Sequence, residues 1–142
     1  MRKLNLKTRK AIAEREDQLV QTSQSIAQQL WKSLKDAQKR DGKVRQLRNI
    51  LEVAESTDSW KALELFIRYQ AARGEINKTW AEGTIQTLEE LQSMANEIAK
   101  ANKANPKTVH LELVTRVLGY AVRWHRWDVE DHKEKSKKQK ES

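Results

Sequence analysis

Five basic side chains fall within ten positions near the end of the N-terminal third of the chain, and their chemistry is that of phosphate binding. Arg45 and Arg48 are three positions apart, so on a helix they share one side and can form paired hydrogen bonds with adjacent phosphates. Clustered Lys and Arg are the electrostatic footprint of a nucleic-acid backbone contact. The alternative for Arg48 is an ion pair with Glu52 and no further role. The five members of this cluster are Lys39, Arg40, Lys43, Arg45 and Arg48.

A second candidate surface lies on one side of the helix that precedes this cluster. No Asp or Glu occurs between Gln18 and Lys35, so neutral donors stand beside lysines without a competing carboxylate. Such a face suits contact with phosphates and sugars without sequence readout. The alternative is an ordinary solvated helix face, because lysine-rich surfaces are common in bundles. Its members recur at steps of three and four residues and are Gln18, Gln21, Ser25, Gln28, Lys32, Lys35 and Lys39.

Two further arginines, Arg68 and Arg73, lie near the end of a helix that we expect to stop at Gly74. On one interpretation they face a groove between helices and contact a nucleic-acid backbone. On the other, they only complement the negative end of the helix dipole.

An aromatic and basic band follows near the end of the last predicted helix. Trp124 continues an apolar stripe, so we expect it in the core, whereas Trp127 is expected to be partly exposed. With Arg123 and Arg126, Trp127 would stack on a nucleobase or on a partner protein. The complete set of predicted nucleic-acid-binding residues is Lys32, Lys35, Lys39, Arg40, Lys43, Arg45, Arg48, Arg68, Arg73, Arg123 and Arg126.

Residue types that do covalent or acid–base chemistry are not grouped in this sequence. There is no glycine-rich phosphate loop, no supported Ser/His/Asp arrangement and no carboxylate pair that helical periodicity would bury together. His125, Asp128 and His132 have helical spacing, but a closed metal site needs more ligands and a supporting shell. We therefore expect no enzyme activity, no catalytic residue, no cofactor and no bound metal.

The net charge of +8 is concentrated at the two ends of the 142-residue chain. Residues 1–45 contribute +7 and residues 133–142 contribute +3, whereas residues 46–132 contribute −2. A near-neutral body with a basic N-terminal third favours contact with a polyanion along one long element. If the basic clusters act together, they must converge on one surface.

The composition indicates the cellular compartment and argues against a membrane protein. Cysteine is absent, and we expect neither a signal peptide nor a membrane span, so a cytoplasmic protein with no membrane partner is predicted. Binding to an anionic membrane surface would need an apolar face of the first helix to stay exposed.

Helix-favouring residues dominate, with one proline and four glycines, which predicts an all-α protein. We expect a compact bundle of about five helices, beginning with a long basic N-terminal helix over about 8–40 that Asp41-Gly42 terminates. The second and third helices are predicted over about 43–55 and 60–74, separated by the cap-forming residues 56–59.

The fourth helix is expected to begin at a capping box between Thr79 and Glu82 and to fray near Asn102. Asn105 then caps the fifth helix, with Pro106 in its first position. We expect one helical domain over residues 1–132. Residues 133–142 form a charged C-terminal tail, a type of segment that is normally disordered unless the fifth helix or a partner orders it.

Two segments resemble the helical small subunits of multisubunit CRISPR effector complexes, which line the belly of Cascade-type and type III assemblies. They are residues 66–74 (FIRYQAARG) and 120–127 (YAVRWHRW). Both look most similar to the C-terminal helical region of the type I-D large subunit, within which a small subunit can arise from an internal start. In length, helical layout and basic bias the resemblance covers nearly the whole chain.

The resemblance implies a non-catalytic subunit that is present in several copies and stabilises guide–target duplex or displaced DNA strand through backbone electrostatics. The implied partners are guide RNA, target and non-target DNA or target RNA, the backbone and large effector subunits, and further copies of the chain itself. The alternative is a helical protein–protein adaptor with a basic face and no nucleic-acid role.

Overall fold

The computed structural model describes the backbone of residues 2–34 and 37–141, and the side chains of residues 2–34 and 43–140. The described residues form six helices and no strand, which confirms the predicted all-α class. The helices are α1 (Leu6–Ala13), α2 (Glu16–Ser33), α3 (Ala37–Ser56), α4 (Trp60–Ala72), α5 (Lys78–Asn102) and α6 (Pro106–Glu141).

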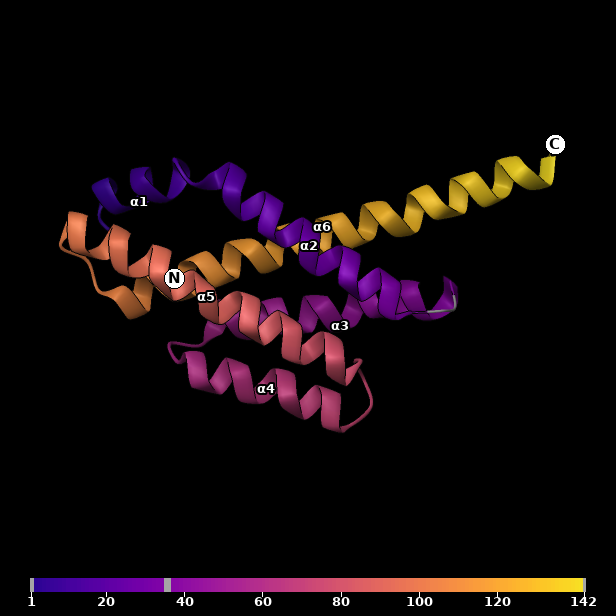
Figure 1. Ribbon diagram of the computed structural model, residues 1–142, viewed down its shortest axis with the longest axis horizontal. Helices are drawn as coiled ribbons and strands as arrows, with labels where there is room; N and C mark the ends of the chain where they lie inside the picture. Colours follow the sequence, from indigo (N-terminus) through magenta and orange to yellow (C-terminus); the bar gives the residue numbers. More distant parts are fainter. Residues whose placement is uncertain (1, 35–36, 142) are drawn as a thin grey trace.

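Helix α6 is the element against which most of the others pack (Figure 1). It has 36 residues and a length of about 54 Å at a rise of about 1.5 Å per residue. Helices α2, α3 and α5 all pack against it, while α4 packs on α3 and α5. The apolar residues that α6 buries there include Val109, Leu113, Val114, Val117, Leu118 and Ala121.

The prediction of one long N-terminal helix is wrong, because the chain leaves the helix at Arg15, with φ −101° and ψ 6°. No glycine or proline marks this break, and its cause is tertiary. Helix α1 packs on α5, whereas α2 packs mainly on α6, and one straight helix cannot follow both surfaces. Ion pairs hold the junction: Arg15 lies 3.1 Å from Glu97 of α5, and Glu16 lies 3.2 Å from Arg116 of α6.

The predicted helix stop at Asp41-Gly42 is also wrong, because α3 begins at Ala37 and continues through both residues. The chain instead leaves the helix at Leu34, which is extended (φ −113°, ψ 122°) and buried. A glycine inside a helix costs about 1 kcal/mol relative to alanine, and burying the apolar face of α3 outweighs that cost. The buried residues of that face are Val44, Leu47, Ile50 and Ala54.

Two helix starts follow the predicted capping chemistry. At α4 the Ser59 hydroxyl accepts the N–H of Ala62 at 3.1 Å, and at α6 the Asn105 side chain accepts the N–H of Lys107 at 2.9 Å, directly after Pro106. These contacts satisfy N–H groups that have no partner within the first helical turn.

The predicted capping box at the start of α5 is wrong by two residues. Asn77, not Thr79, is the cap, and its side-chain oxygen accepts the N–H of Trp80 at 2.9 Å. Asn is a stronger N-cap than Thr, so Asn77 caps the helix and Thr79 lies within its first turn.

Helix α6 continues into the charged C-terminal segment as far as Glu141 and extends beyond the other helices (Figure 1). Ion pairs one turn apart support it, with Lys135 at 2.9 Å from Asp131 and Lys138 at 3.5 Å from Glu134. Such pairs stabilise an exposed helix modestly. Of the alternatives for this segment, continuation of the last helix is the one observed.

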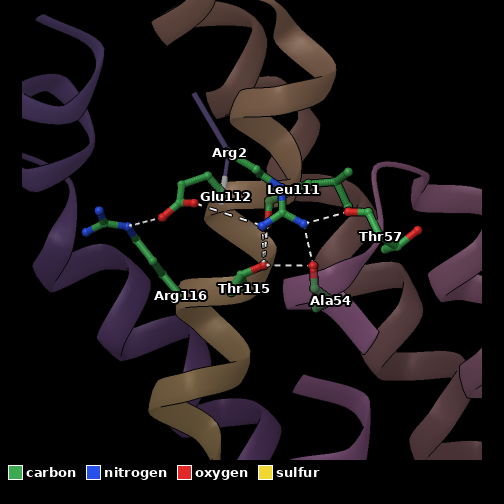
Figure 2. A network of polar contacts seen from close by, with 7 residues as sticks. All are labelled: Arg2, Ala54, Thr57, Leu111, Glu112, Thr115 and Arg116. Carbon is green, nitrogen blue, oxygen red and sulfur yellow. Dashed lines mark hydrogen bonds and ion pairs between the residues drawn. The ribbon is translucent and has the colours of Figure 1, made fainter. Parts of the chain in front are cut away.

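A buried arginine ties the N-terminal segment to α3 and α6 (Figure 2). The side chain of Arg2 is only 7% exposed, and its guanidinium donates to the backbone carbonyls of Ala54 and, at 2.9 Å, of Thr57. It also donates to the Thr115 hydroxyl at 3.0 Å and lies 4.0 Å from the Glu112 carboxylate. Because the end of a helix leaves carbonyls unpaired and carries partial negative charge, Arg2 both satisfies and neutralises the C-terminus of α3.

Substitution Arg2→Gln is expected to lower the free energy of unfolding by about 2–3 kcal/mol, because the α3 carbonyls and Glu112 lose a buried charged donor. Denaturation followed by circular dichroism measures the change. The control is Lys3→Gln at the neighbouring exposed position, which should change stability by less than about 0.5 kcal/mol. Equal, small effects of the two variants would contradict the anchoring role.

Candidate nucleic-acid interface

Helices α3 and α4 form a groove that brings together two of the predicted arginines. Arg45 on α3 and Arg73, directly after α4, both line this groove, which has a volume of about 660 Å³. Its polar lining also includes the amides of Gln46, Asn49 and Gln70. The cluster predicted around Lys43 and the cluster predicted at the end of the third helix therefore meet in the folded chain.

Glu75, in the connection between α4 and α5, fixes one end of the α3–α4 groove. Lys43 donates to the Glu75 backbone carbonyl, and Gln46 donates to its carboxylate at 3.1 Å. Arg73 lies 3.9 Å from the same carboxylate. Gly74 has φ 78°, a left-handed conformation that glycine adopts without steric cost and that lets the chain turn here. Lys43 is thus held by the fold, which limits its part in binding a ligand.

Arg45 and Arg48 differ from Lys43 because both side chains are exposed. Within the described side chains neither makes an ion pair, and the alternative pairing of Arg48 with Glu52 is not formed. Arg48 lies one turn along α3 from Arg45 and outside the groove lining. Two guanidinium groups are therefore available on one side of this helix without first breaking an internal contact.

The outer surface of α4 is partly aromatic and apolar. Tyr69 is 55% exposed and Leu65 is 68% exposed, and they lie one turn apart on α4. The Arg73 guanidinium lies over the Tyr69 ring at 5.5 Å from its centroid, a cation–π contact. Arg73 is therefore shared between this outer surface and the α3–α4 groove.

Several predicted residues do not contribute to the α3–α4 groove. Arg68 pairs with Glu64 on its own helix at 3.3 Å. Lys32 lies near the end of α2 and lines two other hollows. Lys35 lies outside the described residues, and the side chains of Lys39 and Arg40 lie outside the described side chains.

The predicted arginines of α6 also lie outside the groove lining. Arg126 is 3.3 Å from Glu130 on its own helix, and Arg123 lies over the Tyr120 ring at 5.2 Å from its centroid. Of the predicted basic residues whose side chains are described, only Arg45 and Arg73 line the same groove, so the expectation that all basic clusters share one surface is not met.

A second groove, between α2 and α5, was not predicted from the sequence as a site. Its volume is about 520 Å³, and Lys32 is its one charged lining residue. Trp80 of α5 lines the groove and connects its two helices. This side chain is 5% exposed, and its indole N–H donates to the carbonyl of Ile26 in α2 at 3.1 Å. Ser25 and Lys32 of the predicted acid-free stripe both line the groove. The lining residues of α5 could not be predicted from the sequence, because no sequence pattern shows that α5 is the helix that packs beside this part of α2.

A cavity of about 920 Å³ lies where the N-termini of α4 and α6 approach α5. The ring of Trp60 meets the ring of His110 edge to face at 5.2 Å. His110 is 3% exposed and its Nε2 bonds to the carbonyl of Leu88 at 2.9 Å, so Nε2 carries the proton and donates. Burial lowers the pKa of His110 and keeps it neutral. Charges of both signs line this cavity, since Asp58 stands with Lys61 there.

The aromatic band of α6 is arranged differently from the prediction. Trp124 is only half-buried, and the fully buried position next to it is taken by His125. Trp31 of α2 contacts His125 and His132 through ring edges, at centroid distances of 6.2 and 5.4 Å. Trp127 is 64% exposed, in agreement with its expected partial exposure. In the part of the chain that the structure describes, no three His, Asp or Glu side chains are grouped to hold a metal ion.

Comparison with protein-family models, with curated proteins and with solved structures returns no match for this chain. Across residues 2–34 and 37–141, no helix has an apolar stretch long enough to cross a membrane.

Folding stability is expected to fall on acidification because of His110. Its pKa is lowered in the folded state, so the unfolded chain binds the proton more tightly. The stabilising contribution is complete above the ordinary pKa of 6.5 and is lost as the pH falls from there through the lowered pKa. His110→Gln should therefore reduce the loss of unfolding free energy between about pH 7.5 and about pH 5, measured by denaturation at each pH.

The control is Gln92→Ala, which changes an exposed residue without a titratable group in the lining of the same cavity and should keep the wild-type pH dependence. If the His110 variant also keeps it, burial of a neutral His110 does not govern acid stability.

Proposed function

We propose that this chain is a non-catalytic nucleic-acid-binding subunit that holds a strand through its phosphates. The observation that carries the proposal is the convergence of Arg45 of α3 and Arg73, directly after α4, on the α3–α4 groove, with Arg48 exposed one turn along α3. Guanidinium groups bind phosphate oxygens through two parallel hydrogen bonds, which gives geometry as well as charge.

The lining of the groove suits backbone contact without sequence readout. Amide side chains such as Asn49 donate to phosphate and sugar oxygens, which position a strand but carry no base information. The Glu75 carboxylate is already engaged by Gln46 and Arg73. Glu52 lies two turns along α3 from Arg45 and repels phosphate, so the strand is restricted to the Arg45 end of the groove.

In its specific form, the proposal is that the chain acts as the small subunit of an RNA-guided CRISPR effector complex. The resemblance of residues 66–74 and 120–127, the all-helical layout and the basic bias support this form. Guide RNA, target or displaced strands, the backbone and large subunits and further copies of the chain are then its partners. The guide reads the target sequence, and this chain stabilises what the guide has selected.

The alternative function is that of a protein–protein adaptor, and one observation favours it. Leu65 and Tyr69 expose apolar and aromatic surface on the outer side of α4. Tyr and Arg are enriched at the centres of protein interfaces, and Arg73 lies directly over Tyr69.

The double variant Arg45→Gln/Arg48→Gln tests the phosphate-binding proposal. Each lost phosphate contact should reduce the slope of log affinity against log salt by about 1, so the double variant should lose about 2. Affinity for a fluorescent single-stranded oligonucleotide should fall by about tenfold or more at low salt, measured by anisotropy.

The control is Arg9→Gln/Lys10→Gln, which removes the same charge from exposed positions of α1. It should keep most of the wild-type slope. An equal loss in the two double variants would mean that binding depends on total charge, and an affinity indifferent to salt would refute phosphate binding altogether.

Leu65→Asn separates the adaptor from the strand-binding subunit. If the chain is an adaptor, this variant loses assembly with purified effector subunits, and the wild-type chain shows no salt-dependent strand binding for the charge variants to weaken. If the chain binds strands through Arg45 and Arg48, the charge variants lose strand binding while Leu65→Asn retains it.

A further inference from the structure

Trp127 is a large aromatic side chain that the fold leaves outside the core. It is 64% exposed on α6, and within the described residues its indole makes no hydrogen bond and no contact with another aromatic ring. A tryptophan usually contributes its apolar ring to a core or to an interface. The ring of Trp127 is therefore available to a flat group from outside the chain.

Arg123 lies one helical turn before Trp127 on the same side of α6. Its side chain is exposed, its guanidinium lies over the Tyr120 ring at 5.2 Å from the centroid, and within the described side chains it makes no ion pair. Trp124, three positions before Trp127, is half-buried. Residues three and four apart are neighbours on a helix surface. We call this group the α6 aromatic strip, and its members are Tyr120, Arg123, Trp124 and Trp127.

The carboxylates that follow the strip along α6 are paired or lie elsewhere. Glu130 lies 3.3 Å from Arg126, and Asp131 lies 2.9 Å from Lys135. Asp128 lines the hollow that α6 forms with α2. The charge of the strip itself is its single guanidinium, which attracts an anionic group without first breaking an ion pair.

The apolar surface of the strip is small. Trp127 is its one large side chain that is mostly exposed, and the nearest exposed positions on α6 are charged, with Arg123 on one side and Glu130 on the other. A protein interface needs several adjacent apolar side chains at its centre. One exposed ring beside one unpaired guanidinium instead fits a ligand that joins a flat ring to an anion, and a nucleotide is such a ligand.

We propose that the α6 aromatic strip binds an unpaired nucleotide of a nucleic-acid strand, with the base stacked on Trp127 and the phosphate bonded to Arg123. Every base has a π face, so this contact tolerates any sequence. In a duplex both faces of a base are covered by its neighbours. The strip therefore selects single-stranded RNA or DNA over a duplex.

This inference rests on the proposed function, that the chain binds a strand, and adds a contact of a different kind. The strip shares no residue with the lining of the α3–α4 groove. Phosphate contacts in that groove weaken as salt is raised, whereas stacking on Trp127 involves no charge. The two contributions can therefore be measured separately.

Trp127→Ala tests the inference, with Leu6→Ala as its control. Leu6 is also a large apolar side chain, 68% exposed, and it lies on α1. Trp127→Ala should weaken binding of a fluorescent single-stranded oligonucleotide by about fivefold or more with the salt slope unchanged, while Leu6→Ala stays within about twofold of wild type. Trp127→Phe keeps a smaller ring and should retain part of the lost affinity.

An abasic oligonucleotide of the same length separates stacking from charge. It keeps the phosphates and has no bases, so Trp127→Ala should leave its binding unchanged. Arg123→Gln removes a phosphate contact and should reduce the salt slope by about 1 for both strands.

Strand binding that Trp127→Ala leaves unchanged, or weakens equally for the abasic strand, overturns the inference and leaves the α3–α4 proposal intact. Loss of assembly with purified effector subunits in this variant, with strand binding retained, assigns the strip to a protein partner and also overturns it. If Trp127→Ala weakens binding and Arg45→Gln/Arg48→Gln does not, the strip stands and the α3–α4 proposal fails. If the wild-type chain binds no oligonucleotide, both fail.

Discussion

Burial of one side of α6 is the constraint on which the arrangement of the other helices depends. Residues such as Val117 and Leu118 are completely buried, and α2, α3 and α5 all pack against α6. Each of these helices is amphipathic and cannot bury its apolar face alone. The course of α6 therefore fixes where α3 presents Arg45 and how closely α2 and α5 approach each other. Arg2 reinforces the arrangement by binding the end of α3 and the side of α6 together.

The net charge of +8 is not equally available over the surface. Many exposed basic groups pair with a carboxylate on their own helix, as Arg68 does with Glu64 and Lys135 with Asp131. Such pairs contribute little to stability, but the carboxylate weakens the positive potential that a phosphate meets. Arg45 and Arg48 are exposed without a partner in the described side chains, and Lys32 stands in a groove without carboxylates. Two kinds of surface result, one suited to charge-assisted pairing and one to many neutral hydrogen bonds.

The sequence predicted features that depend on local chemistry and missed those that depend on packing. The Asn105 cap and the break before α4 follow from a few neighbouring residues, and these predictions were confirmed. The break at Arg15 was missed because α1 and α2 follow different neighbours, and Gly42 was read as a stop although packing of α3 outweighs its cost. The meeting of Arg45 with Arg73 was expected in outline. The polar α2–α5 groove was not expected, because only its α2 side corresponds to a pattern in the sequence, the stripe without acidic residues.

The central claim is that a nucleic-acid strand contacts the α3–α4 groove through its backbone. Titration of the isotope-labelled chain with an oligonucleotide, followed by amide chemical shifts in nuclear magnetic resonance, tests where the strand lies. The account predicts shifts at Arg45, Arg48 and Arg73 that diminish together as salt is raised, with α1 unaffected. Shifts confined to the lysines of the C-terminal part of α6, or an absence of shifts at any salt concentration, would contradict it.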